Sequence, residues 1–460
     1  MSPFPFPFPP RFRAILPRLR HDLAACLSSE AIREACHAAG HRWRDRALNP
    51  VTTVYLFLLQ VLHGNTACQH VVHFGIWRFS ESAYCQARKR LPLVVFQKLL
   101  EQITVKLRQT TRTSSLWLGR HRVWIVDGSS FSMSDVAELQ RQFGQPGGQR
   151  PGCGFPVAKF LALVDMATGM ISRVMTAPLR SHELSRVAQV HDALQVGDVL
   201  MGDRGFCSFA HLALLVQKSV HAVFRIHQQI IVDFTSGRQH VPVNAKKQPA
   251  GLPRSRWERA LGLNDQIVTW FKPKKPPGWM TPEQFASLPN EITARELRYR
   301  VETRGFRTRE ITLVTTLLDA EIYSAEALAD LYYRRWQVET NYKDLKITME
   351  MDVLHCKTVE GVLKELAVFA LAYNLVRSVM VEAARTRGVP VIRISVQDTV
   401  RWLIGQEAEK GGGVIVIKVN RRRSGRVEPR VKKRRPKQYL RMTAPRSVLR
   451  KRLLEQNVAA

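Results

Sequence analysis

Alternating strand-like and helical segments between residues 123 and 226 constrain the fold of this chain most strongly. Short apolar runs bounded by turn residues predict strands, and longer stretches with apolar residues at three- and four-residue steps predict helices. In chain order we expect three strands, a helix, a strand, a helix and a strand, at 123–127, 157–164, 170–176, 181–194, 198–203, 206–217 and 222–226. This alternation predicts a mixed α/β layer with helices packed on the faces of a sheet.

Two of these strands end in an aspartate, Asp127 and Asp203. A side chain at the end of a strand emerges at the edge of the sheet, and neighbouring strands would bring the two carboxylates together. Adjacent carboxylates repel each other unless a cation lies between them, and oxygen-only ligands favour Mg²⁺ or Mn²⁺. For each aspartate alone, a role in a turn or a helix cap is the competing interpretation.

The stretch 328–346 contains neither glycine nor proline, and Ser324 offers an N-terminal cap, so we expect one helix here. At about 100° per residue, four side chains would fall within an arc of roughly 60°. They are Tyr332, Arg335, Glu339 and Lys346. Such a stripe is either a solvated helix face with ion pairs four residues apart or a functional surface.

Glu339 could supply a third carboxylate if its helix packs across the ends of the two strands. Together with Asp127 and Asp203 it would complete a pair of metal sites about 3.5–4 Å apart, the arrangement used for in-line phosphoryl transfer. One ion would activate water or a 3′-hydroxyl, and the other would stabilise the leaving oxygen.

The charge balance predicts a polyanionic partner. The chain has 460 residues, with 70 Lys and Arg against 38 Asp and Glu, for a net charge of +32. An excess of this size on a soluble chain most simply indicates nucleic acid. The segment 418–441 carries twelve of the basic residues and is typical of a tail that binds phosphates without sequence preference.

Cysteine usage and hydropathy indicate a reducing compartment and no membrane span. The seven cysteines are scattered and lack a paired C-x-x-C spacing. The apolar run 51–62 is too short to cross a bilayer, and 366–381 is interrupted by Asn374 and Arg377. We therefore expect a cytoplasmic protein without a membrane segment.

Outside the α/β layer, the patterns divide the chain into further regions. Helices are expected at 30–39, 50–62, 82–91, 358–384 and 394–404, and strands at 230–234, 266–271, 295–302 and 311–318. The resulting domains are a Pro/Phe-rich flexible arm at 1–22, a helical DNA-binding domain at 23–115, the catalytic core at 116–226 and 310–384, a β-rich insertion at 227–309, and a helical and basic region at 385–460.

The segment 80–90 is a candidate DNA contact within the helical domain. It opens with a capping serine and ends with Arg88, Lys89 and Arg90, which would suit a helix lying against DNA. A solvated helix whose basic end matches the helix dipole explains the same residues.

The chain resembles the DDE transposases of the insertion sequence 4 family, which have an RNase H-like catalytic core. Tyr332, Arg335, Glu339 and Lys346 match the spacing of that family's YREK signature at every step. The segments 126–129 and 202–206 resemble its two aspartate motifs, and the β-rich insertion precedes the glutamate as in such relatives. The resemblance covers most of residues 25–445.

The resemblance implies a specific set of roles. Asp127, Asp203 and Glu339 would be catalytic and hold two Mg²⁺ or Mn²⁺ ions, whereas Tyr332, Arg335 and Lys346 would contact the phosphates of the transferred DNA end. The partners would be the element's own terminal inverted repeats and target DNA, bound by a homodimer associated with the nucleoid.

One departure concerns a tryptophan that hairpin-forming relatives can place before the last sheet strand. Residues 308–311 read Thr-Arg-Glu-Ile here, so the sequence does not favour a route through a flipped base.

Two other functions fit the same sequence. One is a transposase-derived regulator that binds DNA without cutting it, and the other is an RNase H-like nuclease that cuts without joining. Uninterrupted acidic motifs argue against the first, whereas the basic tail and the helical N-terminal region would have no role in the second.

Overall fold

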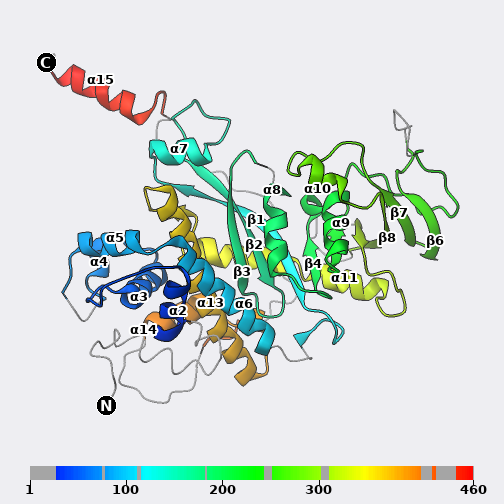
Figure 1. Cartoon of the computed structure of the whole chain (residues 1–460), viewed down its shortest axis with the longest axis horizontal. Coiled ribbons are helices and arrows are strands. Elements are labelled where there is room, and N and C mark those ends of the chain that lie inside the picture. The colour runs from blue at the N-terminus through cyan, green and yellow to red at the C-terminus, as the bar shows by residue number, and fades with distance from the viewer. Residues whose placement is uncertain are drawn as a thin grey trace.

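A computed structural model describes residues 27–74, 78–110, 115–181, 184–242, 251–301, 310–405, 417–420 and 442–458. The arm at 1–22, the basic run at 421–441 and residues 308–309 of the tryptophan comparison lie outside the described residues. Within them, one large mixed sheet has the strand order β3-β2-β1-β4-β5-β9-β8-β7-β6, and β10 adds to β1 (Figure 1).

The first half of the sheet is RNase H-like. It contains β1 (Val123–Met133), β2 (Val157–Asp165), β3 (Ile171–Pro178), β4 (Val199–Gly202) and β5 (His221–Arg225). Strands β1, β4 and β5 are parallel, whereas β2 runs antiparallel to β1 and β3 antiparallel to β2. The order 3-2-1-4-5 with helices on its faces confirms the predicted fold class.

The apolar start of β1 is explained by burial on both faces of the sheet. Successive side chains of a strand point to opposite faces. Val123 and Ile125 join one hydrophobic cluster, and Trp124 and Val126 join the other. A strand covered on both faces therefore shows a continuous apolar run, with no alternation.

Helices cover the two faces of this half. On one side, α13 (Val359–Arg387) and α6 (Leu93–Thr110) contact β3. On the other, α8 (Leu184–Val190) and α9 (Phe209–Gln217) contribute to the cluster around Trp124. Among the described residues, α13 alone has the length and hydropathy to cross a membrane, and 94% of its apolar window is buried inside the protein.

The predicted insertion continues the same sheet. Strands β6 (Arg256–Gly262), β7 (Asp265–Phe271), β8 (Glu291–Arg300) and β9 (Glu310–Thr315) pair antiparallel, and β9 pairs with β5 of the core. The strand predicted at 230–234 was wrong: that segment forms no strand, and β6 takes the outer position of the sheet.

A buried arginine of the insertion forms an ion pair within it and a hydrogen bond to the segment that follows it. The Arg295 guanidinium on β8 donates to both oxygens of Asp265 on β7 and to the backbone oxygen of Tyr323. Arg295 is fully buried, and this pairing offsets the cost of taking its charge out of water. The Tyr323 contact links the insertion to the segment just before the helix that carries the site residues.

A bundle of helices forms the N-terminal part. It comprises α2 (Ser29–Ala38), α3 (Pro50–Leu62), α4 (Cys68–Val71), α5 (Glu81–Arg90) and α6. Every residue of α3 is buried, and α3 packs against α13, α2 and α5. The helices predicted at 30–39, 50–62 and 82–91 are confirmed to within two residues.

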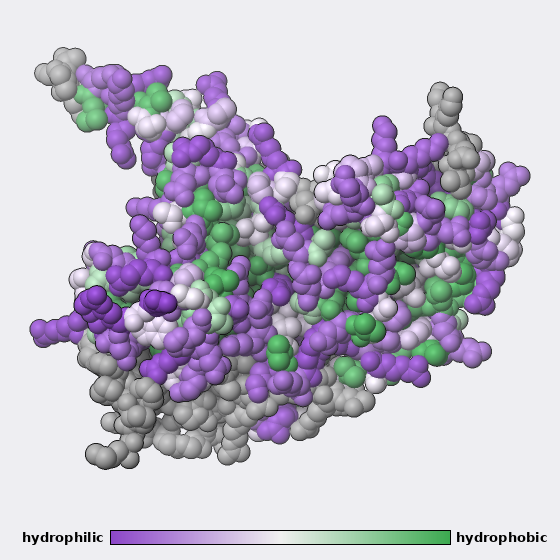
Figure 2. All heavy atoms as spheres, viewed as in Figure 1, coloured by the Kyte–Doolittle hydropathy of each residue, from purple (hydrophilic) through white to green (hydrophobic). Residues whose placement is uncertain are grey.

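The helical caps follow the sequence signals. Ser28, Asn49 and Ser80 each accept a hydrogen bond from a backbone N–H in the first turn of their helices. Near the C-terminus, α14 (Val396–Gly405) packs on α13, and α15 (Arg446–Val458) projects away from the body (Figure 1). Hydrophilic side chains cover most of the face in Figure 2, as the charge of the chain predicts.

Candidate active site

Asp127 and Asp203 leave neighbouring parallel strands at the same level. Val126 of β1 is in register with Gly202 of β4, and each aspartate is the next residue along its chain. The strand pairing thus explains why two carboxylates that are distant in sequence lie at one edge of the β1–β4 pair.

The strand β1 does not end at Asp127, contrary to the sequence prediction. It continues to Met133, where it pairs with β2 and with β10 (Val353–Leu354). Only the pairing with β4 stops before Asp127. The strand was predicted too short because full burial of its side chains stops at Asp127 and resumes only at Phe131. The backbone stays extended through these residues.

Local hydrogen bonds orient both carboxylates. The backbone N–H of Gly128 donates to Asp127 Oδ1 over 2.8 Å, and that of Gly205 donates to Asp203 Oδ1 over 2.8 Å. In each aspartate, Oδ1 accepts the local hydrogen bond and Oδ2 takes no part in it. Gly202 allows the close packing beneath them, since a Cβ there would meet Val126 and Phe224 at 3.1 Å.

The stretch 328–346 is not one helix, so that prediction was wrong in detail. It divides into α11 (Ala325–Tyr333), α12 (Trp336–Lys343) and a π-helical turn, η6 (Asp344–Thr348). Neither glycine nor proline marks the break, and Arg334 and Arg335 at the break keep right-handed helical backbone angles. The N-terminal cap by Ser324 is confirmed.

Arg335 lies at this break, between two carboxylates that the sequence assigned to metal. Its Nη1 is 3.4 Å from Asp127 Oδ2, and its Nη2 is 3.4 Å from Glu339 Oε1. Arg335 is only 6% exposed, whereas the Glu339 side chain is 53% exposed. The Arg335–Glu339 contact is the ion pair four residues apart that a solvated face predicted, but its cation is buried.

The surroundings of Arg335 favour its charged form. Burial lowers the pKa of the guanidinium, but Tyr332 and the three acids Asp127, Asp203 and Glu339 outweigh burial and hold the pKa above its ordinary value. The guanidinium carbon also lies 5.7 Å from the ring centre of Tyr332 and 5.0 Å from that of Trp336. Arg335 is therefore a permanent cation in a negative site.

Tyr332 is buried beside this cation. It is 1% exposed, and burial raises the pKa of its phenol to about 12, although the Arg335 charge opposes that rise. The structure brings Tyr332 close to Arg335 but does not place it on the surface.

Tyr342 and Ser129 belong to the site and were not identified from sequence. The Tyr342 hydroxyl donates to the backbone oxygen of Asp127 over 2.6 Å, and its ring meets Phe160 of β2 edge-on at 5.2 Å. These contacts fix α12 against the sheet. Lys346 Nζ lies 3.4 Å from Ser129 Oγ on β1. Tyr342 lies three residues after Glu339, so the two share one face of a helix. This spacing was the sequence signal that could have assigned Tyr342 to the site.

The donor set fits a hard divalent cation in chemistry but is not gathered around one point. Carboxylate oxygens are the ligands that Mg²⁺ and Mn²⁺ prefer. Within the described part of the chain, however, no three His, Cys, Asp or Glu side chains lie close enough together to hold a metal ion. Arg335 supplies the positive charge between Asp127 and Glu339.

A family model described as the Transposase DDE domain matches residues 118–375. This stretch begins just before β1, ends inside α13 and contains all six predicted site residues. The chain belongs to the DDE transposase family. Membership agrees with the two aspartates that follow the last paired residues of β1 and β4 and with the RNase H-like strand order.

Two curated relatives are similar to the chain. The transposase InsG for insertion sequence element IS4 of Escherichia coli (strain K12) is 25% identical over 305 residues, which is 66% of this chain. The chain spans 62% of the length of that relative. The probable transposase for insertion sequence element IS5377 of Geobacillus stearothermophilus is 25% identical over 370 residues, covering 79% of this chain and 84% of the relative.

A solved structure also overlaps the chain. It is the cryo-EM structure of the piggyBac transposase synaptic complex with hairpin DNA, with a TM-score of 0.43 and 12% identity. The match covers 83% of this chain and 79% of the other.

Proposed function

We propose that this DDE transposase cuts DNA at the terminal inverted repeats of its own element and joins the 3′-hydroxyl ends to target DNA. The observation that carries the proposal is the register of β1 and β4, which brings Asp127 and Asp203 to one edge, with Glu339 linked to Asp127 through Arg335. Two carboxylates at one edge, with a third reached through a shared arginine, suit metal-assisted phosphoryl transfer better than a structural role.

Asp127, Asp203 and Glu339 would hold two Mg²⁺ or Mn²⁺ ions. When bound, the ions supply an activated water or 3′-hydroxyl and stabilise the leaving oxygen. The chain's own contribution is to place the acids. Tyr342 holds the backbone of Asp127, and Gly128 and Gly205 orient the two aspartates. To join the aspartates at a metal ion, the exposed Glu339 side chain would have to leave Arg335 and rotate toward them.

Lys346 is the phosphate contact that the geometry supports most directly. It is half-buried, and its Nζ contacts the neutral Ser129 hydroxyl, so its charge is available to a DNA phosphate beside Asp127. Arg335 would reach a phosphate by exchanging its carboxylate contacts. Because Tyr332 is buried, its proposed contact requires α11 to shift when DNA binds.

The partners in this proposal are double-stranded terminal repeats and target DNA, bound by a homodimer of the chain in the cytoplasm at the nucleoid. The net charge of +32 supports binding to a polyanion. We call the edge that carries Asp127 and Asp203 the acidic edge. Binding by a dimer would present two copies of the acidic edge to the two ends of an element.

The direct test is incubation of the purified chain with a labelled terminal-repeat duplex and a target plasmid in Mg²⁺. Cleavage at the repeat followed by joined products is the expected result. Binding without cleavage would indicate the regulator, and cleavage without joining would indicate the nuclease. Asp127→Asn serves as the inactive control, because it removes charge with little change in shape.

A further inference from the structure

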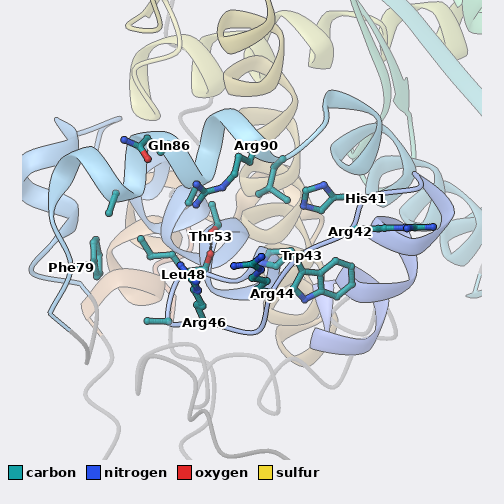
Figure 3. A pocket seen from close by; sticks show the side chains of 15 residues that line it. His41, Arg42, Trp43, Arg44, Arg46, Leu48, Thr53, Phe79, Gln86 and Arg90 are labelled. Atoms are coloured by element: carbon teal, nitrogen blue, oxygen red, sulfur yellow. Dashed lines mark hydrogen bonds between the residues drawn. The ribbon is translucent and has the colours of Figure 1, made fainter.

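The N-terminal helices enclose a pocket of about 680 Å³ that lies apart from the acidic edge. Its walls come from the segment 41–48 between α2 and α3, from α5, and from Phe79 just before α5 (Figure 3). This volume is within the range of small-molecule sites, roughly 300–1,000 Å³.

Arginines dominate the rim of the pocket. Figure 3 shows Arg44 and Arg90 extending from different elements toward the same space beside Thr53, whereas Arg42 points away. Arg46 also lines the hollow. Within the described residues, the structure records no ion pair between these arginines and a carboxylate. Their charges therefore remain available to an anionic ligand.

The local electrostatics agree with that assignment. Burial lowers the pKa of His41, and the positive charges of Arg90 and Lys364 lower it further. The nearest acid in the loop, Asp45, accepts a hydrogen bond from the Asn49 side chain at 3.0 Å and is not among the lining residues. Among the described residues that line it, the pocket is thus cationic without an internal counter-ion.

The remaining walls are apolar and aromatic. Trp43 lies against His41 with near-parallel rings 6.0 Å apart, and Leu48 and Leu91 line the hollow. Phe79 is half-buried, with its ring 6.3 Å from that of Tyr84. A cationic rim over aromatic walls fits a ligand that combines a phosphate with a flat ring.

The helix that carries Arg90 is firmly held. Lys364 of α13 donates to the backbone oxygen of Lys89 over 2.9 Å, at the C-terminal end of α5. Arg88 turns inward, with its guanidinium 3.7 Å from the ring centre of Phe57. The sequence predicted that Arg88, Lys89 and Arg90 at the end of α5 could face DNA. Arg88 packs against the core instead, whereas Lys89 and Arg90 are exposed.

We propose that this pocket binds one unpaired nucleotide of DNA, with its phosphate on Arg44 and Arg90 and its base against the aromatic walls. A paired duplex keeps its bases stacked inside, so its backbone would reach the rim arginines without filling the recess. An unpaired nucleotide can turn its base out and stack it on an aromatic side chain. The inference rests on the proposed function only in taking DNA as the partner.

Three labelled DNAs in EDTA separate this inference from the proposed function, because binding is measured without cleavage. They are a paired duplex, the same duplex with one bulged nucleotide, and the bulged duplex with an abasic site in the bulge. The parent chain is expected to bind the bulged DNA roughly tenfold more tightly than the other two, as stacking on one aromatic side chain predicts.

Phe79→Ala and the double variant Arg44→Ala with Arg90→Ala should each remove that preference. Arg120→Ala is the matched control, since Arg120 is exposed in the turn before β1 and should leave the preference intact. Thermal unfolding of each variant verifies folding. A parent that binds all three DNAs equally overturns the pocket assignment alone, as does a double variant that keeps the bulge preference. A parent that binds no DNA overturns the proposed function as well.

Discussion

The guanidinium of Arg335 lies 3.4 Å from the carboxylate of Asp127, although the two residues are 208 positions apart in the chain. Both side chains are largely buried, at 8% and 16% exposure. Arg335 thus does for the acidic edge what a metal ion would do: it offsets the mutual repulsion of the acids. Metal binding and the Arg335 contacts should therefore compete.

Arg335→Gln should lower the free energy of unfolding in EDTA by about 1–3 kcal/mol, because it leaves a buried carboxylate without its charged partner. The same variant should gain more stability from Mg²⁺ than the parent does, since the competing cation is gone. Urea unfolding with and without Mg²⁺ measures both effects. Arg334→Gln is the matched control, as Arg334 is exposed beside it. Equal Mg²⁺ responses in parent and Arg335→Gln would show that the cation and the metal do not compete.

Asp127→Asn, Asp203→Asn and Glu339→Gln should each abolish cleavage and joining while leaving DNA affinity almost unchanged. Each change removes a negative charge needed by a metal ion and keeps the shape of the side chain. Gel assays of cleavage and of binding report the two properties separately. Asp135→Asn is a control at an acid outside the candidate site, whose carboxylate contacts the Gln140 side chain at 3.5 Å and Arg446 at 3.6 Å. Cleavage that survives any one change would remove that residue from the catalytic set.

Lys346→Ala should slow single-turnover cleavage far more than it weakens overall binding, because many other basic residues still hold the duplex. Lys343→Ala is the comparison, since Lys343 is exposed on α12, three residues before Lys346. It should cut DNA at close to the parent rate. Equal cleavage rates for the parent and Lys346→Ala would contradict a phosphate contact beside Asp127.

Deletion of residues 418–460 should weaken binding to any duplex and flatten the dependence of affinity on salt. Each phosphate contact contributes about 0.9 to the slope of log affinity against log salt, so the loss counts the contacts made by the tail. Fluorescence anisotropy across a salt series gives the slope. A slope identical to that of the full chain would place the tail away from DNA.

The sequence was informative wherever structure is decided by neighbouring residues. The apolar runs before Asp127 and Asp203 predicted buried strands, and the parallel pairing of β1 with β4 brought their ends to one level. Ser80 and Ser324 predicted helix starts because a cap depends only on the next three residues.

The features that the sequence did not reveal depend on contacts between distant segments. The break after Tyr333 carries no glycine or proline, and it coincides with a cation buried between Asp127 and Glu339. The 100° spacing placed Arg335 on a surface stripe, yet the side chain is buried and one of its two partners, Asp127, lies on β1. Tyr342 was missed for the same reason, since its hydrogen bond is to the backbone of Asp127.

The pairing of β5 with β9 brings the two ends of the insertion together: the backbone N–H of Ile226 donates to the oxygen of Thr312 over 2.9 Å. The chain leaves the core and returns to it at almost the same point. This junction is therefore a natural grafting position, where a foreign domain with close termini could replace β6, β7 and β8 without lengthening the path between the core strands. The replacement would have to cover the edge of β9, because a bare strand edge invites pairing between molecules.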